Sequence, residues 1–137
     1  MSPVRYADGL KKYNAGILSP RLSKEEAVGN YMDGVVRQNL RDLFNYHAIS
    51  FGSGRSITIN NRDYDTSQSR TSFRVPDARV GNVSFDWTLS LKTSSSPQIR
   101  GFFAADSEPI GVVIVRPTQL GRYTTYFIPR PSDLKRK

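Results

Sequence analysis

The sequence predicts an α+β fold in which one long helix precedes a mostly antiparallel or mixed sheet of four to five strands. A helical apolar period runs through residues 24–46 and is lost after residue 56. Short alternating or continuous apolar segments then follow as far as residue 131. A chain of 137 residues has the usual size of one domain, so residues 1–137 are expected to form a single one. No apolar run approaches the roughly 18–20 residues of a membrane-spanning helix, so no span is expected.

The helix is predicted from its start signal and its period. Residues 1–22, with two prolines and two glycines, are expected to be an irregular or partly helical lead-in. Ser23 and Glu26 then form a capping box, in which the serine hydroxyl accepts a backbone N–H of the first turn. The apolar residues that share one helical face are Val28, Tyr31, Met32, Val35, Val36, Leu40, Leu43 and Phe44. These signals place the helix at about 24–46, within the segment 23–47.

The sheet region is predicted to cover residues 56–131. Its expected strands are 57–59, 71–75, 82–92, 110–115 and 123–128. The run 110–115 is continuously apolar, which is typical of a strand buried on both faces. The polar stretch 63–69 is expected to be a loop, a short helix is expected to begin at Pro97, and residues 132–137 are expected to be a frayed tail.

The clearest strand signal is the alternation over residues 82–92. Its apolar members are Val83, Phe85, Trp87, Leu89 and Leu91. Its polar members include Asp86, Thr88, Ser90 and Lys92. Because side chains alternate across a strand, the apolar row is predicted to pack against the helix 24–46, while Asp86, Thr88 and Lys92 face a groove.

The charge balance favours a polyanionic partner. The chain has 20 Lys and Arg against 12 Asp and Glu, a formal charge of +8. Arginine supplies most of the basic positions, and its planar fork of donors matches phosphate oxygens. We therefore expect nucleic acid as the first partner. The chain has no cysteine, which excludes disulfides, zinc–thiolate sites and thiol catalysis and leaves the redox compartment open.

Four residues form the candidate catalytic set: Asp77, Asp86, Lys92 and Gln98. Two carboxylates on neighbouring strands can hold Mg²⁺ through oxygen ligands, so Asp77 and Asp86 are the candidate metal ligands. Lys92 would stabilise charge on the phosphate, and Gln98, near the start of the short helix, would position water or substrate. His47 is the only histidine, and it is interpreted as a residue at the helix C-terminus, where a cation is favoured.

The motif Pro76-Asp77 followed by Lys92 resembles the signature of the restriction-endonuclease-like nucleases. Their pattern places an acid two residues before the lysine, and Ser90 stands there in this chain. Asp86 lies on the same predicted face but is six residues from Lys92, about 20 Å along an extended strand. A bulge would be needed to bring both residues to one metal.

An alternative mechanism needs no metal. The order of helix and then sheet is also similar to that of barnase-like and colicin-like RNases, whose Arg, Lys, Thr and Tyr act on an attacking 2′-OH. The candidates for that chemistry are Arg74, Lys92, Arg100, Arg116, Thr118 and Tyr126. The candidate nucleic-acid-binding residues are Arg74, Arg79, Arg100, Arg116 and Tyr126.

Residues 62–131 also resemble the C-terminal toxin modules of bacterial polymorphic toxins, which are delivered by Rhs, contact-dependent inhibition or type VI secretion proteins. The stretches that carry the resemblance are 73–79, 96–103, 115–121 and 126–131. The resemblance implies a nuclease that a bacterium delivers to the cytoplasm of a rival cell and that an acidic immunity protein neutralises. The alternative is a non-enzymatic nucleic-acid-binding protein of a phage or ribonucleoprotein, in which Arg binds phosphate and aromatic rings stack on bases. DNA and RNA are both open as substrates.

Overall fold

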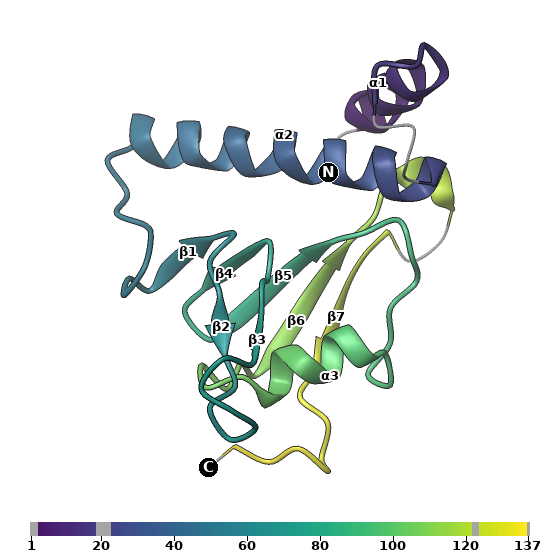
Figure 1. The fold of residues 1–137 in the computed structure, drawn as a ribbon. Coiled ribbons are helices and arrows are strands. Elements are labelled where there is room, and N and C mark those ends of the chain that lie inside the picture. The colour runs from purple at the N-terminus through teal and green to yellow at the C-terminus, as the bar shows by residue number, and fades with distance from the viewer. Residues whose placement is uncertain (1–2, 19–22, 122–123, 137) are drawn as a thin grey trace.

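The computed structural model describes residues 3–18, 23–121 and 124–136. Three helices, α1 (Pro3–Asn14), α2 (Lys24–Tyr46) and α3 (Pro97–Ala104), accompany a mixed sheet, and the predicted α+β class is confirmed (Figure 1). The strands are β1 (Ile57–Ile59), β2 (Asp63–Tyr64), β3 (Phe73–Arg74), β4 (Ala78–Val80), β5 (Val83–Trp87), β6 (Gly111–Val115) and β7 (Thr125–Pro129). In the described part of the chain, no helix has the length and apolar character needed to cross a membrane.

The long helix begins and ends where its sequence predicts. The Ser23 hydroxyl accepts the N–H of Glu26 at 3.1 Å, which satisfies one of the free donors of the first turn. The lead-in is more regular than expected, because α1 is a helix of 12 residues that packs on the first half of α2. Gly9 permits this contact: a Cβ there would lie 3.1 Å from side-chain atoms of both Val28 and Tyr31. Residues 19–22 of the predicted lead-in lie outside the described residues.

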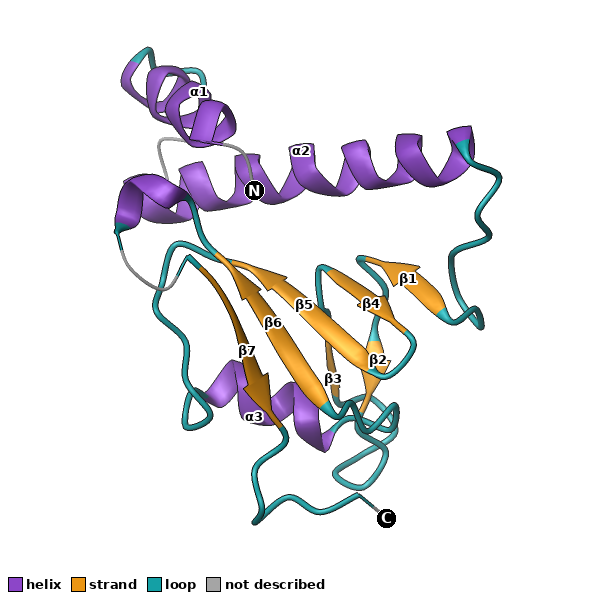
Figure 2. Cartoon of the chain, turned by 180° about the vertical axis from the view of Figure 1, so that it is seen from behind, coloured by secondary structure: helices purple, strands orange, loops and turns teal. Residues whose placement is uncertain are grey.

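The main sheet has the order β1-β4-β5-β6-β7. Every pair is antiparallel except β5 and β6, which are parallel and connected through α3. β2 and β3 form a separate two-stranded hairpin whose β3 contacts α3. Both views show α2 crossing the end of the sheet toward which β5 and β6 run (Figure 2).

Two apolar clusters divide the core between the faces of the sheet. On one face, Val112 and Ile114 pack with Ile99, Phe102 and Phe103 of α3. On the other, Trp87 and Val115 pack with Val36 and Leu40 of α2. The two clusters bury β6 on both sides, as its continuous apolar run predicts.

The predicted strand 82–92 is too long. The N–H of Thr88 donates the last hydrogen bond of this pairing, to the carbonyl of Val115 at the end of β6. Among the described residues, no partner strand continues beside residues 89–92. Trp87 is buried against α2 as predicted, but Leu91 is 55% exposed. Asp86 does not face an open groove, since it is only 9% exposed.

Three smaller expectations also change. The predicted loop 63–69 begins with strand β2, and the predicted strand 71–75 is reduced to Phe73–Arg74. Strand β4, residues Ala78–Val80, was not expected from the sequence and places Asp77 at its start rather than in a free turn. The predicted first residue of the last strand, position 123, lies outside the described residues.

Candidate active site and nucleic-acid interface

The carboxylate of Asp77 is fixed between the sheet and α2. The pairing of β4 with β5 ends at Ala78 and Phe85, and the N–H of Asp77 donates to the Phe85 carbonyl at 3.0 Å, so Asp77 lies beside the end of β5 that carries Asp86. Oδ2 of Asp77 accepts the backbone N–H of Trp87 at 2.8 Å, and Oδ1 accepts a hydrogen bond from Arg37 at 2.9 Å. Asp77 is therefore a buried ion-pair partner of α2 and a cap on the end of β5.

Asp33, Asp77 and Asp86 form the acid cluster, in which burial controls protonation. Burial, reinforced by the negative charge of Asp77, raises the pKa of Asp33 to about 8 and that of Asp86 to about 7. Burial also raises the pKa of Asp77, while the Trp87 N–H and the Arg37 guanidinium oppose that shift. A hydrogen bond between the carboxyls of Asp86 and Asp77 favours the protonated form of Asp86 and the charged form of Asp77.

Two polar atoms on one face of β5 have no partner among the residues that the structure describes. They are Oγ of Ser84 and Oδ2 of Asp86, both fully buried. A buried polar atom without a hydrogen bond costs about 1–3 kcal/mol, so such atoms are unusual in a folded protein. Perturbed carboxyls of this kind are concentrated at functional sites.

Lys92 acts on Asp86 through its charge and forms no ion pair with it within the part of the chain that the structure describes. Its positive charge lowers the pKa of Asp86, opposing the effect of burial. The chain turns away after Trp87 and is held by Tyr126, whose hydroxyl accepts the N–H of Lys92 at 2.9 Å and donates to its carbonyl at 2.6 Å. The expectation of one extended strand from Asp86 to Lys92, from which a separation of about 20 Å follows, is wrong, because β5 ends at Trp87.

The other predicted residues are dispersed. Gln98 is half-buried in the first turn of α3, and within the described chain no hydrogen bond joins it to the acid cluster. Four of the predicted nucleic-acid-binding residues make intramolecular contacts: Arg100 with Asp133 at 2.5 Å, Arg79 with the Gly81 carbonyl, Arg116 with the Leu89 carbonyl, and Tyr126 with Lys92. Arg74 is exposed, Thr118 begins the short 3₁₀ helix 118–120, and His47 caps the C-terminus of α2.

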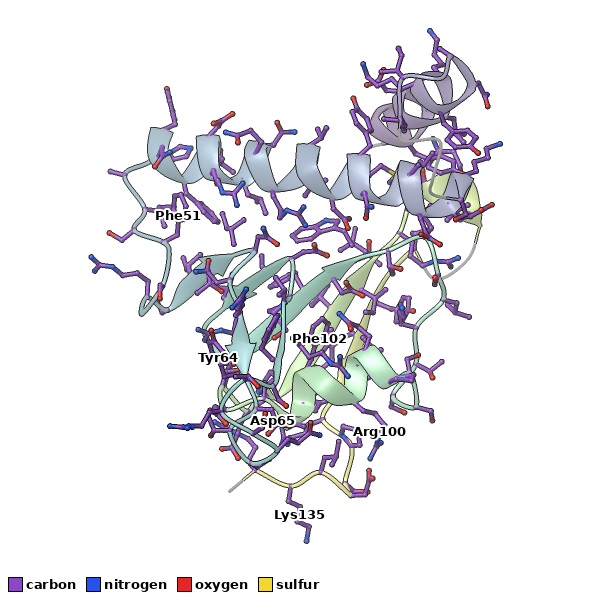
Figure 3. All side chains as sticks on the ribbon, in the orientation of Figure 1. Phe51, Tyr64, Asp65, Arg100, Phe102 and Lys135 are labelled. Carbon is purple, nitrogen blue, oxygen red and sulfur yellow. The ribbon has the colours of Figure 1, made fainter. Side chains whose placement is uncertain are left out.

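A second charged region surrounds β2 and β3. We call residues 62–74 the basic hairpin, because Arg62, Arg70 and Arg74 are all exposed and form no ion pair with any residue that the structure describes. The rings of Tyr64 and Phe73, each 39% exposed, pack edge to face beside them, and the Arg62 guanidinium lies 4.4 Å from the Phe73 ring centre. Figure 3 shows Tyr64 on this hairpin, close to Asp65. Exposed Arg beside aromatic rings is typical of surfaces that bind single-stranded nucleic acid.

Sequence reasoning missed Arg62 and Arg70 of this hairpin, and Asp33 and Arg37 of the acid cluster. Asp33 and Arg37 are four residues apart, the spacing that puts an acid and a base on one helical face, and that signal could have found them.

The donor set for a metal is sparse. Within residues 3–18, 23–121 and 124–136, no three His, Cys, Asp or Glu side chains are grouped so that they could hold a metal ion. Both oxygens of Asp77 are already engaged, and within this pair of predicted metal ligands Oδ2 of Asp86 is the atom without a hydrogen-bond partner among the described residues. This set does not fit a closed metal cage. Mg²⁺ bound mainly by water and substrate phosphate would reach the buried Oδ2 of Asp86 only after this side chain becomes exposed.

The fold and these two regions define the class of protein: an α+β domain with a buried acid cluster next to an exposed basic hairpin. Comparison with models of protein families, with curated proteins and with solved structures returned no match. The resemblance to toxin nucleases therefore rests on the sequence motifs alone.

Proposed function

We propose that this protein is a nuclease that cleaves phosphodiester bonds of nucleic acid. The observation that carries the proposal is the pairing of Asp86 with Asp77 beside Lys92. Asp86 has a pKa of about 7, so at neutral pH it is present in both the acid and the base form. A group with such a pKa is suited to general acid–base catalysis.

Each residue of the site has a proposed role. Asp86 accepts the proton of the attacking hydroxyl, which is water or the 2′-OH of RNA. Lys92 stabilises the negative charge that develops on the phosphate oxygens. Asp77, held by Arg37 and the Trp87 N–H, is a positioning residue that keeps Asp86 protonatable near pH 7.

The basic hairpin supports the same proposal, because it lies next to the acid cluster in the chain. Only Val75 and Pro76 separate Arg74 from Asp77, so the two Cα atoms are at most about 10 Å apart. A single strand held on the hairpin by its phosphates would lie near Asp77, and catalysis would require Asp86, which is 9% exposed, to become accessible to that strand.

The proposal includes Mg²⁺ as a cofactor that Asp86 and, with Arg37 displaced, Asp77 would hold. When bound, it would act as a Lewis acid on a phosphate oxygen. The protein's own residues bind and orient the strand in either case.

The test is incubation of the purified protein with plasmid, total RNA and a single-stranded oligonucleotide, with and without EDTA. Asp86→Asn and Lys92→Gln should each lower the cleavage rate at least about 100-fold. Asp42→Asn, an exposed carboxylate on the outside of α2, is the matched control and should cleave normally. Absence of cleavage by the wild-type protein, or full cleavage by the Asp86→Asn/Lys92→Gln double variant, would refute the proposal.

The second candidate is nucleic-acid binding without catalysis, as in a phage or ribonucleoprotein component. It is favoured by the burial of Asp77 and Asp86, which are only 6% and 9% exposed. A groove of about 190 Å³ beside Asp33 is also lined by Glu25 and Glu26, whose charge repels phosphate. Tight binding of the oligonucleotide with no cleavage under any metal condition would support this candidate.

The delivered-toxin role extends the proposal. Its support is the sequence resemblance over residues 62–131 and the charge of +8, which favours an acidic immunity protein. Expression in a bacterial cytoplasm should arrest growth, and Asp86→Asn should relieve the arrest. Normal growth with abundant soluble wild-type protein would count against a toxin.

A further inference from the structure

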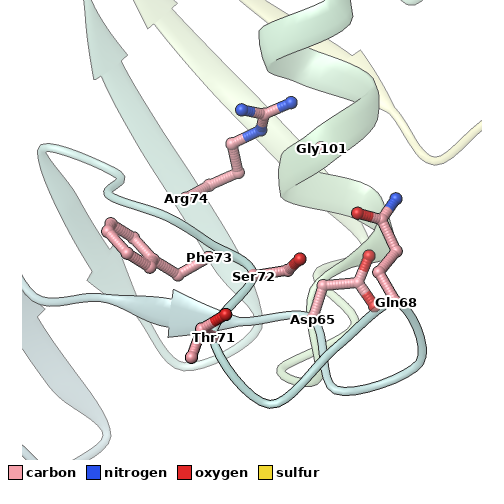
Figure 4. A pocket seen from close by; sticks show the side chains of 7 residues that line it. All are labelled: Asp65, Gln68, Thr71, Ser72, Phe73, Arg74 and Gly101. Atoms are coloured by element: carbon pink, nitrogen blue, oxygen red, sulfur yellow. The ribbon is translucent and has the colours of Figure 1, made fainter.

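A polar pocket of about 290 Å³ lies between the basic hairpin and α3 (Figure 4). Its volume is at the lower end of ligand sites and suits one flat ring system. The Arg74 guanidinium stands at one end, Asp65 and Gln68 stand at the other, and the Ser72 hydroxyl lies between them. A donor group thus faces acceptor groups across the pocket.

Asp65 is held in place as an acceptor. It is 7% exposed, its backbone N–H bonds to the Ser72 carbonyl at 2.9 Å, and its Oδ1 accepts the Ser67 hydroxyl at 2.5 Å. Its Oδ2 has no hydrogen-bond partner among the described residues, and the side chain lines the pocket. The carboxylate is therefore fixed before any ligand binds, which lowers the cost of binding.

Arg74 is positioned by a glycine. A Cβ on Gly101 would lie 2.0 Å from Nε of Arg74 and 2.9 Å from its Cδ, so the guanidinium can lie against α3 only because residue 101 has no side chain. Arg74 makes no ion pair with the residues described, and its donors stay available.

We infer that this pocket binds a guanine base of a single strand, an inference that rests on the proposed action on nucleic acid and adds a base preference. Guanine has two neighbouring N–H donors, N1 and N2, for a carboxylate such as Asp65. It also has two neighbouring acceptors, O6 and N7, that match the fork of Arg74. Adenine has an acceptor at N1, which the carboxylate would repel, and cytosine and uracil lack the purine N7. Unpaired bases can be read in this way because their edges are free.

The experiment measures binding of GMP, AMP, CMP and UMP by calorimetry at low salt, without any cleavage step. GMP should bind roughly five- to hundredfold more tightly than the others. Asp65→Asn, which keeps the shape of the side chain, and Arg74→Ala should each remove that preference. Equal affinity for the four nucleotides, or an unchanged preference in both variants, overturns the inference.

Gly101→Ala is the sharpest variant, because it changes no pocket donor or acceptor. The added methyl group meets the flexible end of an exposed side chain, so the protein should fold with Arg74 displaced and with GMP affinity lowered as in Arg74→Ala. Gly34→Ala, in α2 with nothing within 4 Å of the new Cβ, is the matched control and should leave GMP binding unchanged. Gly101→Ala with wild-type GMP affinity contradicts the inference even if Asp65→Asn fails to fold.

These outcomes are separable from those of the proposed function. GMP preference without cleavage would retain the base pocket and remove the nuclease. Cleavage without GMP preference would retain the nuclease and remove the base pocket.

Discussion

The acid cluster and the basic hairpin meet in the chain between Arg74 and Asp77, but they differ in the sign of their charges and in how far these charges are buried. In the cluster, Asp33 and Asp77 share the charge of Arg37 between α2 and the sheet, and the charge of Lys92 acts on Asp86. In the hairpin, three arginines stand in water without an acidic partner among the described residues. In the cluster, burial raises the free energy of a charged side chain because it removes water from the charge. In the hairpin, water solvates the charges, and their free-energy cost is small.

The difference predicts that the acid cluster contributes to the free energy of folding and the basic hairpin to the free energy of binding. The cluster is stabilised by internal contacts, so altering it should change the folding of the chain. The hairpin keeps its charges for a partner, so altering it should change binding and leave folding almost untouched. A protein that acts on phosphate needs both: a strand must be attracted by exposed charge, and a proton must be moved by a group whose pKa burial has shifted.

The largest effect is expected for Asp77→Ala. The substitution leaves Arg37 half-buried without its carboxylate and removes the acceptor of the Trp87 N–H. Breaking a buried pair from one side costs about 3–5 kcal/mol, which urea denaturation will measure. Asp42→Ala, on the exposed side of α2, should cost less than about 0.5 kcal/mol. A small cost for Asp77→Ala would mean that the cluster is not a folding determinant.

The arginines of the hairpin should make the affinity for nucleic acid depend on salt concentration. If Arg62 and Arg70 each neutralise one phosphate of a single strand, while Arg74 binds the base, the slope of log K against log salt is about −1.4. Affinity for a single-stranded oligonucleotide should then fall about sevenfold between 50 and 200 mM salt. An affinity that does not change over this range would remove the electrostatic basis of the interface.

The pH dependence of stability sharpens the same comparison. The folded-state pKa of Asp33, about 8, is above its ordinary value of 3.8, so between these limits the folded protein binds more protons than the unfolded chain. The stabilisation from this group is complete below about pH 4 and is lost as the pH rises through about 8. The expected slope is at most about 1.4 kcal/mol per pH unit for each such carboxyl.

Asp33→Asn isolates this contribution, because an asparagine remains neutral at every pH. The free energy of unfolding of the variant should fall less between pH 5 and pH 8 than that of the wild-type protein. Identical pH profiles from denaturation of the two proteins would show that Asp33 does not carry the effect.

The sequence predicts the helix well and the strands less well, for a physical reason. The boundaries of α2 follow from local signals, namely the Ser23 cap and the helical period. The end of β5 does not follow from local signals, because β5 ends where its partner strand β6 ends, at Val115. The alternation of residues after Trp87 gives no information about the end of β6. A three-residue strand such as β4 has too few residues for a period to be detected.

The candidate site shows the same limit. Neighbouring strands bring Asp77 and Asp86 together, as the sequence analysis expected, although the strand that does so is the unpredicted β4. The charge of Lys92 acts on Asp86 from a segment that leaves the sheet after Trp87 and is held by Tyr126, a contact 34 residues away in sequence. Contacts of this range leave no trace in local pattern.

The smallest expected effect concerns a single hairpin arginine. Arg70→Ala removes an exposed charge that has no ion-pair partner among the described residues, so the free energy of unfolding should change by less than about 0.5 kcal/mol. One phosphate contact fewer should make the salt slope shallower by about 0.7, with a uniform loss of affinity across sequences. Titration of a single-stranded oligonucleotide at several salt concentrations measures this slope, and Arg136→Ala, in the C-terminal tail, is the matched control. If Arg70→Ala destabilised the fold as strongly as Asp77→Ala, the separation between a region that folds the chain and a region that binds its partner would fail.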